Sequence, residues 1–384
     1  MTSNERKQAR YLRRKAKRDE KRKERNADYN NFDKVFSFEH LWKSLQKCCK
    51  NVGWKTSTQK IRNRPITSLA KTYTRLHNGT YKSNGFYEFK IIERGKERQI
   101  KSVHISERVV QKCLCDYCLT PIFLPTLIYD NAASIKNKGI DFTKRRLVKH
   151  LRQHYAKYGN RGNALVYDFS KYFDRIRHEI LLQRTAAYIS DERIMALFTH
   201  FVKCFGERGL GLGSQISQNA AIFYPNELDH AIKEKLRIKG DARYMDDGYL
   251  ISDKIGTLRR ALTVIKQICD KYGIVLNTKK TQIVKLSRGI PFLKHRFLLT
   301  DTGKIIKIPF KDSARTMKRK IKIFSRWVAE GKMPKTDAIV SFESWKSHLL
   351  RSNAHRCLRK MDLYAKQKIY NITEVSNNGK NKDS

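Results

Sequence analysis

The chain has 384 residues, enough for a substantial core and for more than one packed subdomain. It carries 82 Lys and Arg against 36 Asp and Glu, a net charge of +46 that is spread along its whole length. No run approaches the roughly 18 apolar residues of a membrane span, and the polar N-terminus lacks a secretory signal. A basic membrane-surface protein would confine its charge to one amphipathic helix. The composition therefore predicts a nucleic-acid partner and no membrane.

The N-terminal third begins with charge and continues with regular elements. Residues 1–34 are almost entirely polar, and we expect a basic flexible arm, or a helix that becomes ordered only on RNA or DNA, that anchors nucleic acid. A helical pattern follows, with Phe38, Leu41 and Leu45 on one face. Alternation of apolar and charged residues then predicts a β-hairpin over residues 86–105.

The next helix is expected to start after an N-cap at Ser106 and to stop at Pro121. Within it, Cys113, Cys115 and Cys118 are close enough to share a zinc ion. They also follow an apolar helical pattern, and no fourth ligand comes at a useful spacing, so core packing is favoured over zinc. The eight cysteines as a whole show no disulfide framework, which indicates a reducing cytoplasm.

The middle of the chain alternates strands and helices. An apolar strand over residues 164–167 ends at Asp168 and precedes an amphipathic helix. A glycine-rich loop then leads into another helix, and residues 242–252 are typical of a hairpin. Gly273 is the expected C-cap of the helix after it. Strand-like segments and basic helices complete the chain.

Three carboxylates stand out in this basic chain. Asp168 ends one strand, and Asp246 and Asp247 lie at the hairpin turn, so adjacent strands could present all three at one edge of a sheet. Like charges that close repel unless a cation lies between them. Mg²⁺ prefers such oxygen ligands, and two ions roughly 3.5 to 4 Å apart can activate a hydroxyl and stabilise a leaving oxygen. The alternative is an ordinary turn, because Asp is a common turn residue.

Several motifs occur in the order and spacing of the reverse transcriptases. "YMDD" at 244–247 resembles the central motif of that family, and "VYDFSKYFDRI" resembles its first aspartate motif. "GLGSQISQNAAIFYPNELD", "LNTKKTQI" and "FLKHRF" are similar to the following motifs. Upstream, "ERQIKSVHISERVVQKCL" and "NAASIKNKGIDFTKRRL" are similar to its fingers motifs. The resemblance extends from about residue 90 to residue 300.

The resemblance implies roles for individual residues. Asp168, Asp246 and Asp247 would be catalytic metal ligands, with the carbonyl of Phe169 completing a site. Phe173 would contact the sugar C2′ and select deoxynucleotides. The remaining nucleotide-binding candidates are a lysine near the leaving pyrophosphate, two cations for the triphosphate and two residues of the glycine-rich motif: Lys280, Arg98, Lys101, Leu212 and Gln218.

One departure narrows the resemblance. Leu212 replaces the Gln that many bacterial and retroviral members place against the incoming base pair, and Ser217 and Gln218 stand where intron enzymes have Ser-Pro. This "SQ" pattern resembles the enzymes of diversity-generating retroelements and of related phage-defence lineages. An aliphatic side chain cannot form the hydrogen bonds of an amide. We therefore do not expect ordinary copying fidelity from this sequence. The residues do not separate these two settings.

The predicted fold is α+β, a right-hand polymerase with fingers, an antiparallel palm sheet with helices, and a helical thumb. The expected divisions are an arm at 1–34, an N-terminal extension and fingers at 35–160, a palm at 161–300, a thumb at 301–370 and a disordered tail at 371–384. The resemblance implies a cytoplasmic RNA-directed DNA polymerase that uses two Mg²⁺ ions, with Mn²⁺ as a substitute. Its partners would be a structured or noncoding RNA template, a cDNA product and dNTPs, and an accessory protein is also allowed.

Three alternatives stay open. A retron or group II intron-like enzyme would use a structured RNA of its own, although Leu212 and the lack of a recognisable maturase segment count against the intron. A non-catalytic RNA-binding scaffold with a polymerase fold would gain nothing from three buried carboxylates. An RNA polymerase of similar fold would not need Phe173 as a sugar filter.

Overall fold

The computed structural model describes residues 2–83, 85–93 and 96–372. It contains helices and three small antiparallel sheets, so the predicted α+β class is confirmed. Apart from its first two residues, the predicted disordered tail lies outside the described part of the chain. Among the described residues, no helix is both long and apolar enough to cross a membrane.

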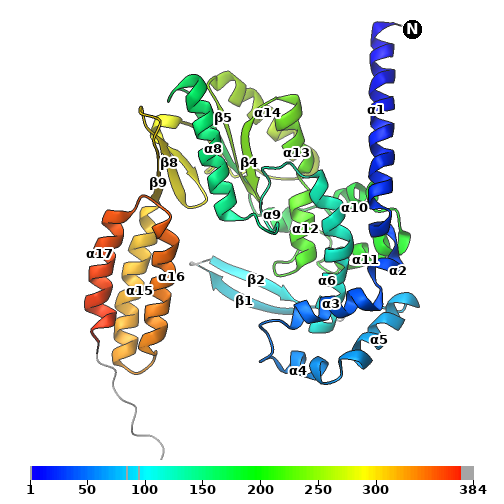
Figure 1. The fold of residues 1–384 in the computed structure, drawn as a ribbon, viewed down its shortest axis with the longest axis horizontal. Helices are drawn as coiled ribbons and strands as arrows, with labels where there is room; N and C mark the ends of the chain where they lie inside the picture. The colour runs from blue at the N-terminus through cyan, green and yellow to red at the C-terminus, as the bar shows by residue number, and fades with distance from the viewer. Residues whose placement is uncertain (1, 84, 94–95, 373–384) are drawn as a thin grey trace, which may run out of the picture.

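The N-terminal residues form a long helix, α1 (Ser3–Asn26), that extends away from the rest of the molecule (Figure 1). A capping box starts it: Thr2 accepts a hydrogen bond from the backbone of Glu5, and the Glu5 side chain accepts one from the Thr2 backbone. The segment expected to be a flexible arm, or a helix ordered only on RNA or DNA, is therefore a helix over Ser3–Asn26. Four shorter helices follow: α2 (Phe32–Val35), α3 (Phe38–Cys49), α4 (Thr56–Asn63) and α5 (Pro65–His77).

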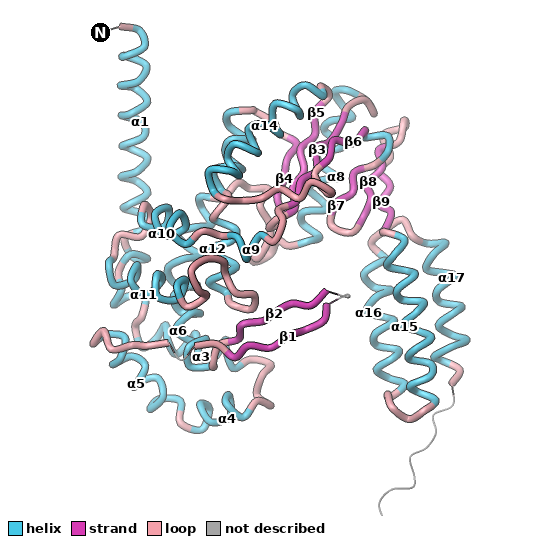
Figure 2. The backbone as a smooth tube through the Cα atoms, turned by 180° about the vertical axis from the view of Figure 1, so that it is seen from behind, coloured by secondary structure: helices cyan, strands magenta, loops and turns pink. Residues whose placement is uncertain are grey.

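The predicted hairpin is present as β1 (Tyr87–Glu93) paired with β2 (Lys96–Ser102). It runs from helices α3 and α6 (Ile105–Leu114) toward the C-terminal helices (Figure 2). Its alternate residues do not enter the core, and side chains such as Ile92 are mostly exposed. The hairpin is therefore positioned by its base, with most of its length open to solvent.

The cysteine-bearing helix differs from the prediction at both ends. Its N-cap is His104, whose side chain accepts a hydrogen bond from the backbone of Ser106. The chain then continues through a π-helical turn (Cys115–Leu119) into α7 (Thr120–Phe123), because Pro121 occupies a first-turn position where no amide is needed. The three cysteines are fully buried in the core, as the packing interpretation predicts. Burial raises the pKa of each thiol above its usual value.

The largest sheet has the strand order β4-β5-β3-β6, all antiparallel. Its strands are β3 (Asn163–Asp168), β4 (Gly240–Tyr244), β5 (Asp247–Ser252) and β6 (Gln282–Lys285). Alternate side chains enter different clusters: Leu165 and Leu250 pack with residues of α14 (Ile255–Tyr272), and Val166 and Tyr249 pack with residues of α8 (Ile140–Tyr158). Helices thus cover both faces, and α8, expected in the fingers, packs on this sheet.

Five helices link these strands to the N-terminal part of the molecule. They are α9 (Tyr172–Arg175), α10 (His178–Ala186), α11 (Glu192–Lys203), α12 (Gln215–Phe223) and α13 (Asn226–His230). Most of their buried apolar residues belong to one core cluster shared with α3, α6 and the sheet. Gly273 ends α14 with a φ of 64°, as predicted.

The C-terminal part contains a small sheet and a helical bundle. Strands β7 (Ile290–Phe292), β8 (His295–Leu299) and β9 (Ile305–Pro309) form a three-stranded antiparallel sheet. Helices α15 (Lys311–Ala329), α16 (Lys335–Leu350) and α17 (His355–Ala365) pack around a separate core that includes Ile321 and Phe342. The expected boundary at residue 300 falls between the paired strands β8 and β9, and the helical bundle starts at Lys311.

Candidate active site

Two predicted site residues face each other across the central strands of the large sheet. The antiparallel register of β3 and β5 pairs Asp168 with Asp247. Asp168 is 4% exposed, and Asp246 and Asp247 are half-buried. The pKa of Asp247 is raised to about 8, mostly by burial and also by a hydrogen bond to Asp168 and by the charges of Asp246 and Asp168. Burial also raises the pKa of Asp246. The pairing therefore brings acidic groups together where water is scarce, which disfavours the charged forms of Asp246 and Asp247.

The turn that carries Asp246 has a strained backbone. Tyr244 pairs with Asp247, which leaves a two-residue loop of Met245 and Asp246. Met245 has a φ of 57°, a region that favours glycine, whereas the φ of Asp246 is not positive; this combination is that of a type II′ turn. The carbonyl of Asp246 accepts a hydrogen bond of 3.2 Å from the amide of Phe169. The strained turn is thus attached directly to the end of β3.

A buried ion pair lies behind the same turn. The guanidinium of Arg243 donates to both carboxylate oxygens of Asp229 and to the carbonyl of Met245, the last at 2.8 Å. It also donates to the carbonyl of Ile222 at 2.8 Å. Both charged side chains are 1% exposed. Arg243 therefore connects the strained turn to α12 and α13. The position of Arg243 directly before the YMDD motif does not by itself predict this role.

Asp168 has partners on both carboxylate oxygens. Lys280 Nζ lies 2.7 Å from Oδ1, and the side-chain amide of Asn277 donates to Oδ2 at 2.9 Å. Burial by itself would lower the pKa of Lys280. The hydrogen bond and charge of Asp168, together with the charges of Asp247 and Asp246, raise this pKa by more, so it lies above its usual value. Asn277 is a contact that sequence reasoning missed, although it belongs to the quoted "LNTKKTQI" motif.

Most of the predicted nucleotide-binding residues line one cavity. It has a volume of about 800 Å³ and is shared by Asp168, Phe169, Phe173, Asp246, Lys280, Arg98, Lys101 and Leu212. The amide of Lys101 donates to the carbonyl of Leu212 at 3.2 Å, which attaches β2 to the glycine-rich loop. The Lys101 ammonium lies 3.3 Å from Glu88 of β1. The hairpin and the sheet therefore contribute to the same cavity.

Two predicted residues lie outside this cavity. Asp247 lines a neighbouring cavity of about 460 Å³, together with Asp168 and Lys280. Gln218 lines a third cavity of about 820 Å³ on the other side of the glycine-rich loop, with Gln215. Gln218 therefore does not share a wall with the three carboxylates.

The donor set fits a divalent cation that takes ligands from elsewhere. Within the described ranges, no group of three or more His, Cys, Asp or Glu side chains has the arrangement of a complete metal site. The oxygens of Asp168, Asp246 and Asp247 are nevertheless hard donors, and a cation would lower the raised pKa values of Asp246 and Asp247. Mg²⁺ commonly uses one or two carboxylates and completes its shell with water and phosphate. These carboxylates would therefore supply part of the Mg²⁺ coordination shell, as is common for this ion.

The similarity of this chain to solved structures is distant. No curated protein matches the chain. Among solved structures, telomerase from Candida albicans in complex with a TWJ fragment of telomeric RNA has a TM-score of 0.45 and 11% identity, with 74% of this chain and 58% of that chain covered. An apo telomerase from Candida tropicalis, truncated from its C-terminal domain, has a TM-score of 0.43 and 16% identity, with 58% and 55% covered. The chain thus spans little more than half the length of either structure.

The sequence model of one family matches residues 82–297, more than half of the chain, and its description is "Reverse transcriptase (RNA-dependent DNA polymerase)". The matched range contains the paired strands, the YMDD turn, Lys280 and the glycine-rich loop. The resemblance noted from the motifs is thereby confirmed at the level of the family, and this chain belongs to the reverse transcriptases.

Proposed function

We propose that this protein is an RNA-directed DNA polymerase that adds deoxynucleotides to a primer 3′-hydroxyl against an RNA template. The observation that carries the proposal is the register of β3 and β5, which sets Asp168 opposite Asp247 with Asp246 in the adjoining turn. The cavity beside these carboxylates is lined by cations from the hairpin and by an aromatic ring, a chemistry suited to a nucleoside triphosphate.

In this proposal Asp168, Asp246, Asp247 and the carbonyl of Phe169 would hold divalent cations, taken to be two Mg²⁺ ions. Such ions, when bound, lower the pKa of the attacking hydroxyl and stabilise the leaving oxygen. In the structure, Nζ of Lys280 lies 2.7 Å from Oδ1 of Asp168 and neutralises that carboxylate. Because its ammonium is half-exposed, it can turn from that carboxylate to the departing pyrophosphate. The chain itself contributes position and charge more than proton transfer.

The experiment that tests the site uses purified full-length protein, an RNA template with an annealed DNA primer, dNTPs and Mg²⁺. Asp246→Asn should abolish primer extension, because it removes a charge and keeps the shape of the side chain. Asp253→Asn is the matched control, since this residue follows the opposite end of β5 from Asp247. Extension that persists in Asp246→Asn, or that is lost equally in Asp253→Asn, would contradict the assignment.

Phe173 is proposed to exclude the 2′-hydroxyl of ribonucleotides. Its ring packs against Tyr172 with centroids 5.8 Å apart, and the side chain lines the cavity of the carboxylates. Phe173→Ala should raise incorporation of ribonucleotides relative to deoxynucleotides, measured as the ratio of kcat/KM values on one template. Phe173→Tyr keeps a ring of similar width and is the control. An unchanged ratio in Phe173→Ala would contradict the filter.

The finer setting is also a proposal. Leu212 lines the cavity, and Ser217 and Gln218 are consistent with an "SQ" lineage that acts in a diversity-generating retroelement or in antiphage defence. The template would then be a dedicated structured or noncoding RNA, with an accessory protein as a further partner. Sequencing the nucleic acid that copurifies with the protein tests this: products rich in adenine substitutions favour the retroelement, and accurate cDNA of one noncoding RNA favours defence.

The proposed division of labour follows the order of the elements. The fingers, with the β1–β2 hairpin, would cover the nucleotide, the large sheet would act as the palm, and the basic α15–α17 bundle would hold the duplex as a thumb. The basic helix α1 would add nonspecific affinity for nucleic acid, which should weaken steeply with salt.

A further inference from the structure

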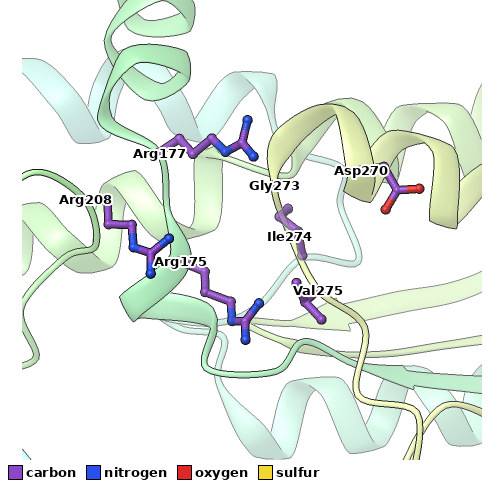
Figure 3. Close-up of a pocket in the computed structure, with 7 residues that line it drawn as sticks. All are labelled: Arg175, Arg177, Arg208, Asp270, Gly273, Ile274 and Val275. Carbon is purple, nitrogen blue, oxygen red and sulfur yellow. The ribbon is translucent and has the colours of Figure 1, made fainter.

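A fourth cavity, of about 300 Å³, adjoins the cavity of the carboxylates at Arg208 and has a different chemistry. Its lining contains three arginines and one acid, with the chain around Gly273 as the opposite wall: Arg175, Arg177, Arg208, Asp270, Gly273, Ile274 and Val275. Figure 3 shows the three guanidinium groups around the opening, and the carboxylate of Asp270 pointing away from Arg175 and Arg208. The cavity is therefore cationic on the side that faces α9.

The backbone fixes these arginines close together. Arg177 and Arg208 are partners in an antiparallel bridge, so their side chains leave the backbone toward the same side. Hydrogen bonds from Gly209 to Ile176 and from Leu210 to Phe173, of 2.8 and 2.9 Å, continue this pairing. The adjacency of the two charges is thus built into the fold and does not depend on long flexible side chains alone.

The three guanidinium groups have no acidic partner in the described part of the chain. Among the described residues, no ion pair or hydrogen bond involves the guanidinium group of Arg175, Arg177 or Arg208; Arg177 contacts the Tyr224 hydroxyl through its backbone amide alone. A Cβ on Gly273 would lie 2.4 Å from Nε of Arg177, so the guanidinium rests directly on the glycine backbone. Three neighbouring charges without a counterion favour binding of a multivalent anion.

The position of the cavity indicates which anion. Arg208 lines this cavity and also the larger cavity that contains Asp168 and Phe173. The carbonyl of Val275 accepts a hydrogen bond of 2.7 Å from Ser170, two residues after Asp168. A ligand bound by the arginines therefore lies next to the proposed site of chemistry, where triphosphates are consumed and pyrophosphate is released.

We propose that Arg175, Arg177 and Arg208 form a polyphosphate-binding site outside the catalytic cavity. This site would hold the triphosphate of a nucleotide before it reaches Asp168, or the pyrophosphate after it leaves. The identity of the ligand rests on the proposed polymerase function, and the presence of the anion site does not. A nucleic-acid backbone is the less suitable ligand, because its phosphates carry one charge each and are spaced apart, whereas a polyphosphate offers several charges within one small cavity.

The first experiment measures binding of inorganic tripolyphosphate to the full-length protein by calorimetry at fixed salt. The variant Arg175→Gln/Arg177→Gln should weaken binding at the strongest site by at least about tenfold, since it removes two charge-assisted contacts. Arg259→Gln/Arg260→Gln is the matched control, because both residues are exposed on α14 and the change in net charge is the same. Equal weakening in the two variants would mean that general charge, and no site, binds the anion, and would overturn the proposal.

Two further measurements test whether the variants fold and whether the planar guanidinium group contributes to binding. Thermal unfolding should be unchanged in both double variants, because the substituted side chains have no buried partner. Arg175→Lys/Arg177→Lys keeps the charge and loses the planar fork, and it should bind tripolyphosphate with intermediate affinity. Affinity of the lysine variant below that of the glutamine variant would contradict a role for charge.

The second experiment distinguishes the two sources of polyphosphate during primer extension. If the site holds the incoming nucleotide, Arg175→Gln/Arg177→Gln should raise the KM for dNTP by about tenfold, with a smaller effect on kcat. If it holds the product, inhibition by added pyrophosphate should weaken instead, with the KM for dNTP retained. A change confined to primer-template affinity would assign the arginines to the nucleic-acid backbone and overturn the proposal. If no extension occurs in any variant, the polymerase function fails, and tripolyphosphate binding still decides the site.

Discussion

Two ion pairs flank the YMDD turn, and they differ in burial. Arg243 and Asp229 are both 1% exposed, and the guanidinium also holds two backbone carbonyls. In the pair on the other side, the Lys280 side chain is 58% exposed and that of Asp168 is 6% exposed. A buried pair is costly to break, whereas a pair with one solvated partner exchanges readily. The turn is thus held on one side by the buried Arg243–Asp229 pair. On the other side, the partly exposed Lys280 can exchange its partner.

The largest expected effect concerns the buried pair. Arg243→Met should lower the free energy of unfolding by about 3–5 kcal/mol, because it leaves Asp229 buried without its counterion. Chemical denaturation measures this loss. The double variant Arg243→Met/Asp229→Leu should recover much of the stability, since no charge stays buried. A loss below about 1 kcal/mol in the single variant would show that this pair is no more important than a surface pair.

A second buried group gives a pH dependence with a defined sign. His150 of α8 is enclosed by Arg146 on its own helix, Asp130, Lys233 and Tyr249, and it is 4% exposed. Arg146 can only donate, so Nε2 of His150 accepts and Nδ1 donates to the Tyr249 hydroxyl at 2.9 Å. Burial lowers the pKa of His150 to about 4, partly offset by Asp130.

Because the folded pKa lies below that of the unfolded chain, the unfolded state takes up a proton first as the pH falls. His150 should therefore reduce stability progressively between pH 6.5 and about 4, by roughly 3 kcal/mol in total. The measurement is the difference in unfolding free energy between the native chain and His150→Gln across this range. His355→Gln, an exposed residue at the start of α17, should leave the pH profile unchanged. Parallel profiles for the native chain and His150→Gln would contradict this prediction.

The smallest effect on stability is expected at the exchangeable pair. Lys280→Met should change the unfolding free energy by less than about 1 kcal/mol. If Lys280 approaches the leaving pyrophosphate, the same variant should lower kcat for primer extension roughly 100-fold. Lys279→Met is the control, because this neighbour is exposed and makes no ion pair among the described residues. Equal effects of the two substitutions on kcat would remove the proposed role of Lys280.

The motifs predicted several features because their causes are local. Alternation of apolar and charged residues revealed the β1–β2 hairpin, and Gly273 has the positive φ that a C-cap requires. The carboxylates were recognisable because Asp168 and Asp247 lie at strand ends and Asp246 lies in the adjoining turn. The helix around the cysteines was assigned a wrong start and a wrong stop, because Pro121 is accepted in a first turn and His104 can act as an N-cap.

Contacts between distant segments were beyond such patterns. Asn277 reaches Asp168 across 109 positions, and the Arg177 and Arg208 bridge depends on two loops meeting. The glycine-rich motif suggested one site for Leu212 and Gln218, yet the loop separates them into two cavities. α8 was expected in the fingers because its first residues resemble a fingers motif of the family, but its buried face packs on the large sheet.

Local chemistry therefore accounts for the elements, the charge and the three aspartates, since propensity, periodicity and turn preference act over a few residues. The arrangement of cations around those aspartates has another origin. The fold decides which carboxylates lie near each arginine. This determines whether the arginine supports a turn, neutralises an acid or is available to bind an anion. That outcome is set by strand register and by the packing of helices against the sheet, which no short stretch of the chain specifies.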